Sequence, residues 1–233
     1  MRLQGFTRLL RHKAPLRVLA IGSSSTEGIG ASSPDHSYPA RFEAELKQRF
    51  KVRDVHVTNA GIGGETAEAS VTRLEGRLKE APYDLIVWQV GTNDAIKGDD
   101  EGHFRDLLER GLQDAKAART DLVFLDQQFY PSIKDPVRYE HYVHLIETVA
   151  AENNTPVLSR YRMMKGWGER SPKDLPGMLS GDGFHMSDRG YQCLANAMVS
   201  AVADLAGEAT SAAVLAPAKT LDTTVPQVTV LRR

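Results

Sequence analysis

The sequence contains a single cysteine, Cys193. One cysteine excludes an internal disulfide framework and a cluster of cysteine metal ligands, and its position on the apolar face of a predicted helix favours simple packing. The formal net charge of -1 gives no reason to expect a nucleic acid or another highly charged partner. No apolar run approaches the ~18–20 residues of a membrane span. We therefore expect a soluble globular protein without cross-links.

Acidic residues are also missing from the N-terminus, where none precedes Glu27. Residues 1–15 form a basic segment whose apolar residues, Leu3, Phe6, Leu9 and Leu10, lie at helical spacing. A secretory signal would have an uninterrupted apolar stretch, which this segment lacks, so we expect a cytoplasmic protein. The favoured interpretation is a helix that covers a sheet edge with its bases in water. Peripheral contact of residues 2–17 with an anionic membrane surface is the alternative.

Between residues 16 and 206, short apolar runs alternate with longer amphipathic ones, as expected of a single domain. The predicted strands are residues 17–22, 52–59, 85–91, 122–126 and 155–158. Strands that alternate with helices indicate a parallel sheet between two helical layers, a three-layer α/β/α fold. Residues 160–181 have an irregular pattern and are predicted to form a wall or lid of a pocket. Residues 207–233 are interpreted as a C-terminal tail.

Four segments carry reactive side chains or tight turns. They are Gly-Ser-Ser-Ser-Thr-Glu-Gly at 22–28, Gly-Gly-Glu-Thr at 63–66, Gly-Thr-Asn-Asp at 91–94 and Asp-Gly-Phe-His at 182–185. Each alone is compatible with an ordinary loop or helix cap. Three of them follow predicted strands one, two and three, and the fourth precedes the last helix. In an open parallel sheet with strand order 2-1-3-4-5, ligands bind at the carboxyl ends of strands one and three, so the segments predict one site.

These residues suit acyl transfer. A serine hydroxyl needs a neighbouring base to become a nucleophile, and His185 is suited to that role near neutral pH. Asp182, three residues earlier, is placed to orient the imidazole. The backbone N–H groups of Ser24 and Gly64 and the side-chain amide of Asn93 are the expected donors to the oxyanion of the tetrahedral intermediate. Among the three adjacent serines, we choose Ser24 as the nucleophile.

The four segments resemble the conserved blocks of the GDSL/SGNH hydrolase family over residues 16–206. The resemblance implies a flavodoxin-like fold with five parallel strands in the order 2-1-3-4-5 and a serine esterase that needs neither a metal nor an organic cofactor. It places Ser24 at the nucleophile, Gly64 at the oxyanion glycine, Asn93 in the third block and His185 in the last. Ser23 stands where the first block usually has aspartate, and Ser25 where it often has leucine. Glu65 stands where the second block often has aspartate.

The expected substrate is a small-molecule or saccharide acyl ester, with a short acyl group such as acetyl on a carbohydrate. An acyltransferase with the same site, a thioesterase or lysophospholipase, and a non-catalytic binding domain are the alternatives. Substrate-pocket candidates are Met163, Met164, Trp167 and Phe184, for which plain packing is an equal alternative. His141 and His144 have a spacing that could hold a metal, but they lack a third ligand and are interpreted as surface residues. The acidic run at 99–101 is expected to cap the next helix.

Overall fold

The computed structural model describes residues 3–170 and 173–205 of the 233-residue chain. Its centre is a five-stranded sheet, and the strands are β1 (Leu16–Gly22), β2 (Val55–Gly61), β3 (Leu85–Gln89), β4 (Asp121–Leu125) and β5 (Val157–Leu158). All neighbouring strands run parallel, in the order β2-β1-β3-β4-β5. The predicted topology is confirmed. The predicted strands overlap the observed ones and differ by up to three residues at their ends.

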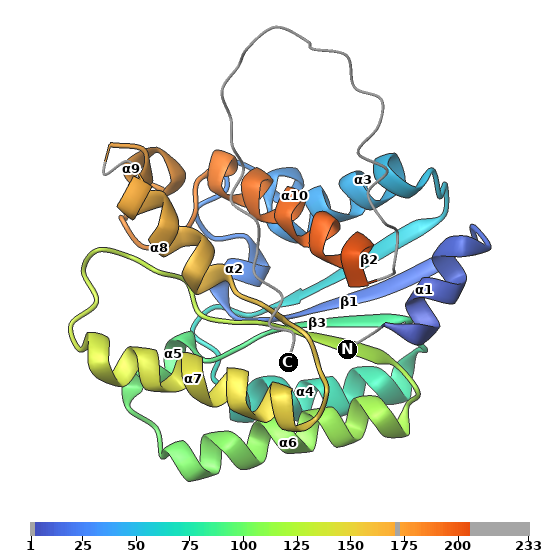
Figure 1. Cartoon of the computed structure of the whole chain (residues 1–233), viewed down its shortest axis with the longest axis horizontal. Coiled ribbons are helices and arrows are strands. Elements are labelled where there is room, and N and C mark those ends of the chain that lie inside the picture. The colour runs from blue at the N-terminus through green and yellow to red at the C-terminus, as the bar shows by residue number, and fades with distance from the viewer. Residues whose placement is uncertain (1–2, 171–172, 206–233) are drawn as a thin grey trace, which may run out of the picture.

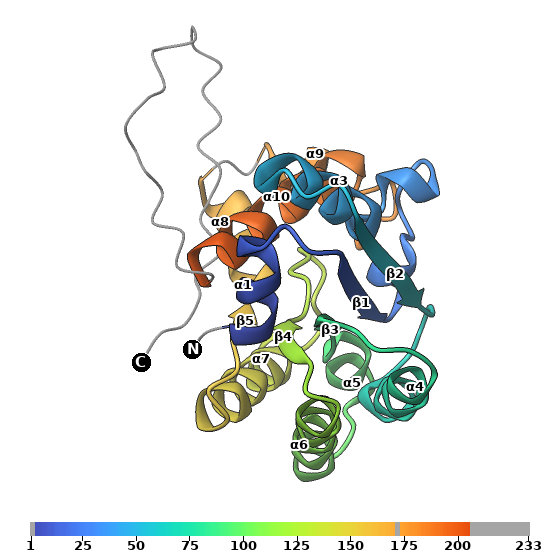
Figure 2. The same ribbon diagram turned by 90° about the vertical axis from the view of Figure 1, so that its right-hand side faces the viewer.

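Helices cover both faces of the sheet (Figures 1 and 2). One layer contains α3 (Tyr38–Phe50), α8 (Arg160–Arg170) and α10 (Asp188–Leu205). The other contains α4 (Ala67–Glu80), α6 (Glu101–Ala117) and α7 (Pro136–Glu152). Short helices are α2 (Ser24–Glu27) after β1, α5 (Thr92–Lys97) after β3 and α9 (Leu175–Met178) after α8, with a 3-10 turn at Pro34–His36. The molecule therefore has the three layers that the alternating pattern predicts.

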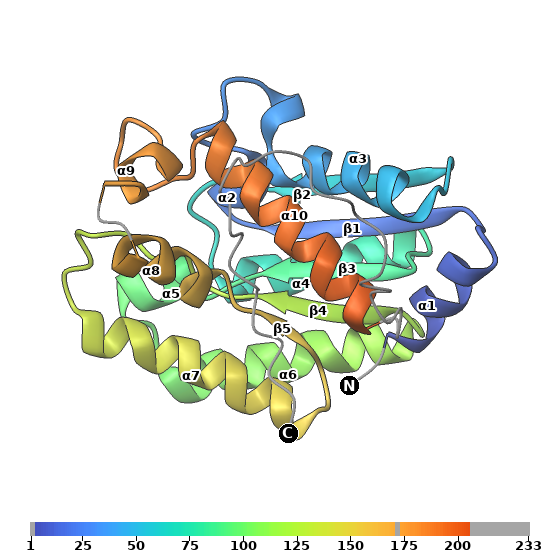
Figure 3. The ribbon, with the colours of Figure 1, turned by 45° about the horizontal axis from the view of Figure 1, so that its top comes forward.

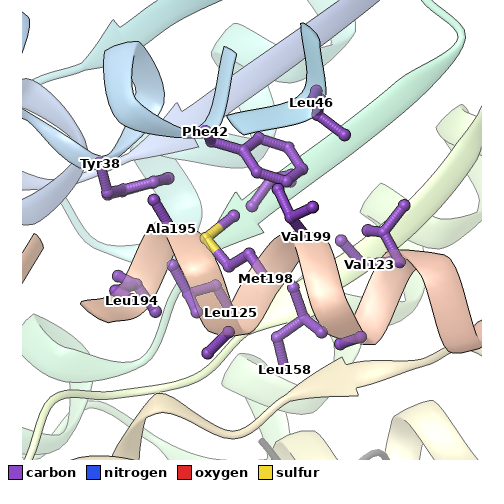
Figure 4. Close-up of a cluster of buried hydrophobic side chains, with 14 of the residues drawn as sticks. Tyr38, Phe42, Leu46, Val123, Leu125, Leu158, Leu194, Ala195, Met198 and Val199 are labelled. Atoms are coloured by element: carbon purple, nitrogen blue, oxygen red, sulfur yellow. The ribbon is translucent and has the colours of Figure 1, made fainter. Parts of the chain in front are cut away.

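Two hydrophobic cores result from the alternation of side chains along the strands. Val18 and Ala20 of β1 pack in the core beneath α3 and α10, whereas Leu19 and Ile21 pack in the core with α4 and α6. Figure 3 shows α10 lying across the sheet beside α3. In Figure 4, Met198 of α10 is seen close to Phe42 of α3, at the centre of the first core. Burial on both faces explains why the sequences of β3 and β4 are almost continuously apolar.

The basic N-terminal segment forms α1 (Gln4–Arg11), which packs on strands β1 and β4. Leu3, Phe6 and Leu10 are buried in the first core, and the backbone N–H of Phe6 donates to Asp121 Oδ2 at 2.9 Å. This packing favours a covering helix over membrane contact, because the apolar face is already used inside the protein. Within the described ranges, no helix is long and apolar enough to cross a membrane. The tail predicted at 207–233 lies outside the described residues.

Residues 160–181 are more regular than their sequence suggests. The expected irregular wall or lid is wrong in part, since α8 and α9 lie within this range. The side chains of Met163, Met164 and Trp167 are 3%, 0% and 4% exposed and belong to the first core. Burial of these three side chains on one side of α8 outweighs the weak helix propensity of Gly166 and Gly168. Plain packing, the alternative left open by the sequence, accounts for all three.

Candidate active site

Ser24 is presented by a tight turn at the end of β1. The strand ends at Gly22, and α2 begins at Ser24, so the serine occupies the first position of a helix. The end of β2 passes directly against this turn. A Cβ atom on Gly61 would lie 1.9 Å from the backbone nitrogen of Glu27, which only glycine can accommodate. The side-chain carboxylate of Glu27 in turn accepts a hydrogen bond from Gly63 N at 2.7 Å. The first and second predicted segments are therefore joined before any substrate binds.

His185 and Asp182 lie on a short hairpin that precedes α10. Leu179 and Met186 form an isolated antiparallel bridge, and Ser180 N donates to His185 O at 2.8 Å. Within this hairpin, Asp182 Oδ1 accepts hydrogen bonds from Ser180 Oγ at 2.7 Å, Phe184 N at 2.8 Å and His185 N at 2.9 Å. These contacts fix the carboxylate without help from distant parts of the chain.

The hairpin brings the imidazole onto the serine turn. His185 Nε2 lies 2.8 Å from Ser24 Oγ, and His185 Nδ1 lies 2.6 Å from Asp182 Oδ2. Partial burial alone would raise the pKa of the Asp182 carboxyl. The hydrogen bonds from His185, Ser180 and two backbone N–H groups outweigh that effect and hold this pKa well below its usual range. Asp182 is therefore ionised at neutral pH and orients Nδ1 as a donor, which leaves Nε2 free to accept the serine proton.

Asn93 and Gly64 lie on two adjoining segments, the start of α5 and the loop between β2 and α4. Asn93, the second residue of α5, donates from Nδ2 to the backbone oxygen of Glu65 at 2.8 Å. Gly64 has a φ of +77°, a left-handed conformation that favours glycine, and nothing lies within 4 Å of a Cβ built on it. The Glu65 carboxylate is held by Arg73 of α4, whose Nε donates to Oε1 at 2.6 Å and whose Nη2 contacts Oε2. Glu65, which follows Gly64 and accepts the hydrogen bond from Asn93, is thus held by the long helix α4.

Asp94 provides a second hydrogen bond between the start of α5 and the segment that carries Gly64 and leads into α4. Its Oδ1 accepts from the backbone N–H of Ala67, the first residue of α4, at 2.8 Å. Burial raises the pKa of Asp94 to about 6, although backbone hydrogen bonds from Ala67 and its own turn oppose the shift. Asn93 and Asp94 together therefore fix α5 against the start of α4 and the loop that carries Gly64.

Phe184 is the pocket candidate that the structure places beside the site. It is half-buried, and its ring lies 4.7 Å from both the Tyr130 ring and the His185 ring in edge-to-face arrangements. These contacts restrict the imidazole and give the site an aromatic wall. The role of Phe184 in substrate binding stays a prediction.

Other residues singled out in the sequence have structural partners. Asp100 caps α6 by accepting from His103 N at 2.7 Å, as expected of the acidic run. His144 Nδ1 contacts Glu140 O at 2.7 Å, and His141 Nδ1 lies 3.4 Å from Glu101. In the described part of the chain, no three His, Cys, Asp or Glu side chains gather as metal ligands would. Cys193 is partly buried against the first core.

Two glutamines at strand ends were missed by the sequence reasoning. Gln89 Oε1 accepts from Ser23 N at 2.9 Å and from Ser23 Oγ at 3.1 Å. Gln128 Oε1 accepts from Ser25 Oγ at 2.8 Å. Their positions could have indicated them in the sequence, because each glutamine ends or follows an apolar strand, as several of the predicted site residues do. Arg73 gave no such signal, since an arginine on an amphipathic helix is ordinarily solvated.

A comparison with known families agrees with this geometry. The pattern of the non-GDSL lipase-like family matches residues 1–208. The chain belongs to this family. Esterase TesA of Pseudomonas aeruginosa is 25% identical over 177 residues, which cover 76% of this chain and 83% of that protein. Thioesterase 1/protease 1/lysophospholipase L1 of Escherichia coli K12 is 25% identical over 146 residues, or 60% of this chain and 64% of that protein.

Solved structures show the same fold. The crystal structure of TesA superposes with a TM-score of 0.69 at 24% identity and covers 81% of this chain and 99% of that chain. A two-domain esterase active on acetylated mannans superposes with a TM-score of 0.71 at 21% identity, over 90% of this chain and 56% of that chain. Membership of the family, together with these relatives, makes the protein an enzyme, a carboxylic ester hydrolase of the SGNH/GDSL type.

Proposed function

We propose that the enzyme cleaves carboxylic esters through an acyl-enzyme formed on Ser24. The observation that carries this proposal is the hydrogen-bonded chain from Ser24 Oγ to His185 Nε2 and from His185 Nδ1 to Asp182. His185 takes the serine proton while Ser24 Oγ bonds to the substrate carbonyl carbon. The resulting oxyanion accepts hydrogen bonds from Ser24 N–H, Gly64 N–H and the amide of Asn93. His185 then donates its proton to the departing alcohol oxygen.

Deacylation uses the same groups with water in place of the alcohol. His185 removes a proton from the water, whose oxygen bonds to the acyl carbon, and a second tetrahedral intermediate forms in the same oxyanion site. Collapse of this intermediate breaks the bond to Ser24 Oγ, which regains its proton from His185 and releases the acid. Asp182 stays ionised throughout and stabilises the imidazolium that exists during each half of the reaction.

The proposed substrates are esters with a short acyl group, including acetyl groups on a carbohydrate. Burial of Met163, Met164 and Trp167 in the core supports this choice, because these side chains are then unavailable to line a long acyl channel. The similarity to thioesterase 1/protease 1/lysophospholipase L1 of Escherichia coli supports thioesterase and lysophospholipase activity as the second candidate. Transfer of the acyl group to an alcohol would proceed through the same acyl-enzyme. A cytoplasmic location stays a prediction.

A panel of substrates tests these choices. p-Nitrophenyl esters from acetate to palmitate, an acetylated oligosaccharide and an acyl-CoA are assayed side by side, with and without an acceptor alcohol. The proposal expects the highest kcat/KM on the shortest esters and free acid as the product. A maximum on long acyl chains or on acyl-CoA would favour the second candidate, and an ester of the added alcohol would favour transfer.

The nucleophile is tested by covalent labelling. An organophosphonate is expected to inactivate the wild-type enzyme and to add its mass to the peptide that contains Ser24. Ser24→Ala is expected to abolish both labelling and hydrolysis while the protein remains folded. Labelling that persists at Ser23 or Ser25 in this variant would overturn the assignment of the nucleophile.

A further inference from the structure

The two serines that flank Ser24 have polar partners inside the protein. Ser23 and Ser25 are 4% and 1% exposed. Ser23 is held by Gln89 at the end of β3, which also accepts from Thr26 Oγ1 at 3.2 Å. Ser25 Oγ donates to Gln128 Oε1 at 2.8 Å. Each of the two buried hydroxyls therefore has a buried glutamine as its partner, as a buried hydroxyl requires.

Gln128 has a second contact that Gln89 lacks. Its Nε2 donates to the backbone oxygen of Phe184 at 3.2 Å, and Phe184 immediately precedes His185. A backbone oxygen only accepts hydrogen bonds, so the amide orientation is fixed, with Nε2 toward Phe184 and Oε1 toward Ser25. The backbone of Gln128 is also held, because Tyr139 OH donates to its oxygen at 2.7 Å. The side chain is 1% exposed, which shields both hydrogen bonds from water.

This arrangement joins the neighbours of both reacting side chains. Ser25 follows Ser24, Phe184 precedes His185, and the Ser24 Oγ to His185 Nε2 contact of 2.8 Å links segments 161 residues apart. An amide holds its donor and acceptor at a fixed spacing in one plane, so a single side chain sets the separation of the two loops. Proton transfer depends steeply on that separation, and a misplacement of about 1 Å can lower the rate about 100-fold.

We propose that Gln128 is a positioning residue that keeps Ser24 and His185 within hydrogen-bonding distance. This inference rests on the function proposed above. The side chain of Gln128 bonds to Ser25 and Phe184 rather than to Ser24 Oγ or the His185 imidazole, so it acts through the neighbours of the reacting residues. Its loss is therefore expected to slow the chemical steps while substrate binding is preserved, which separates its role from that of a pocket residue.

The test uses Gln128→Met, which keeps the length of the side chain and removes both hydrogen bonds. Active sites are counted by exhaustive phosphonate labelling, so that kcat refers to competent protein only. We expect kcat to fall about 10- to 100-fold, KM to stay within about twofold, and the rate of phosphonate labelling to fall with kcat. Ser25→Ala removes one end of the contact and is expected to lower kcat severalfold, and the double variant is expected to be no slower than Gln128→Met alone.

Ser70→Ala is the matched control. It removes a buried hydrogen bond of 3.0 Å from Trp88 Nε1, joins neither the serine turn nor the histidine hairpin, and is expected to lower stability without changing kcat. A Gln128→Met enzyme whose kcat per labelled site equals that of the wild type overturns the inference. If Gln128→Met fails to fold, the test rests on Ser25→Ala. A kcat of Ser25→Ala equal to that of the wild type would then overturn the positioning role of Gln128. A wild-type enzyme that neither hydrolyses esters nor becomes labelled overturns the proposed function and this inference with it.

Discussion

The side-chain amide of Asn93 has two N–H bonds, and the structure assigns one of them. Nδ2 donates to Glu65 O at 2.8 Å, which fixes the plane of the amide before substrate binds. The second N–H is the one that the proposed mechanism directs to the oxyanion. A donor that is already oriented needs no reorganisation when charge develops on the substrate, and this preorganisation makes such a group effective in the transition state.

Asn93→Ala is therefore expected to lower kcat by about 100- to 1,000-fold and to change KM little. The reason is that the lost hydrogen bond is strongest to the oxyanion and weak to the ground-state carbonyl. Steady-state kinetics on a p-nitrophenyl ester measure both constants. Asn93→Asp, which keeps the shape but replaces the donor with a carboxylate oxygen, serves as the comparison and should be impaired at least as severely. A variant with raised KM and unchanged kcat would instead assign Asn93 to ground-state binding.

At the residue scale, the sequence predicted the groups that lie on strand-end loops. Ser24 and Asn93 could be located because short motifs at the carboxyl ends of parallel strands converge on one edge of the sheet. Asp182 and His185 could be located because their motif precedes the last helix, and the catalytic roles of all four residues stay predictions. Arg73 could not be located in this way, and the position of Gln128 after β4 does not show what its side chain contacts. Their functions depend on which backbone oxygen or carboxylate a long side chain reaches, and that is decided by tertiary packing rather than by local pattern.

Among the elements, α4 has the most direct connection to the loop that carries Gly64. Arg73 donates from Nε to Glu65 Oε1 at 2.6 Å and from Nη2 to Ala60 O at 2.8 Å. The Glu65 side chain is only 5% exposed, so the ion pair is largely removed from water. Because Glu65 O also accepts from Asn93, movement of this loop relative to α4 would displace the oriented amide.

Arg73→Met is expected to lower the free energy of unfolding by about 3–5 kcal/mol, since it leaves the buried Glu65 carboxylate without its partner. We also expect kcat to fall about tenfold as the loop shifts. Urea denaturation and steady-state kinetics measure the two effects. The double variant Glu65→Gln/Arg73→Met should regain part of the stability because the unpaired charge is gone. Arg77→Met, on the same helix and paired with exposed Glu80, is the control and should change neither quantity appreciably.

Element positions were predicted well where periodicity was strong and poorly where it was interrupted. The five strands and their order follow from apolar runs separated by amphipathic segments. Helix α8 could not be predicted from its sequence, because Gly166, Gly168 and the downstream Pro172 are residues typical of a loop. Its helical form depends on burying Met163, Met164 and Trp167 against α10 and the sheet, an energy that only the assembled protein supplies.

Over the whole molecule, the two apolar cores end at a buried polar layer along the carboxyl edge of the sheet. Asp126 and Arg160 are both 0% exposed within it. Asp126 accepts from Tyr161 N at 2.8 Å and from Ser159 Oγ at 2.7 Å, and its backbone oxygen accepts from Arg160 Nε at 3.0 Å. Burial raises the pKa of Asp126 to about 7, although these hydrogen bonds and the positive charge of Arg160 oppose the shift.

This raised pKa predicts how stability depends on pH. Below about pH 4 the carboxyl is protonated in both the folded and the unfolded state, and well above pH 7 it is ionised in both. Between these limits the folded state holds a proton that the unfolded state has released, so the free energy of unfolding decreases as pH rises. Asp94 acts in the same direction with its pKa of about 6. Both groups thus make the protein less stable at pH 8 than at pH 5.

Asp126→Asn removes the larger of these two contributions while preserving the shape of the side chain. The decrease in unfolding free energy from pH 5 to pH 8, measured by urea denaturation, is expected to be smaller than in the wild type by roughly 2–3 kcal/mol. Glu75→Gln is the matched control, because hydrogen bonds from Lys79 and Arg110 lower the pKa of Glu75 and its titration lies below this range. That variant should keep the wild-type pH dependence. An Asp126→Asn protein with the wild-type slope would mean that Asp126 is already ionised at pH 5.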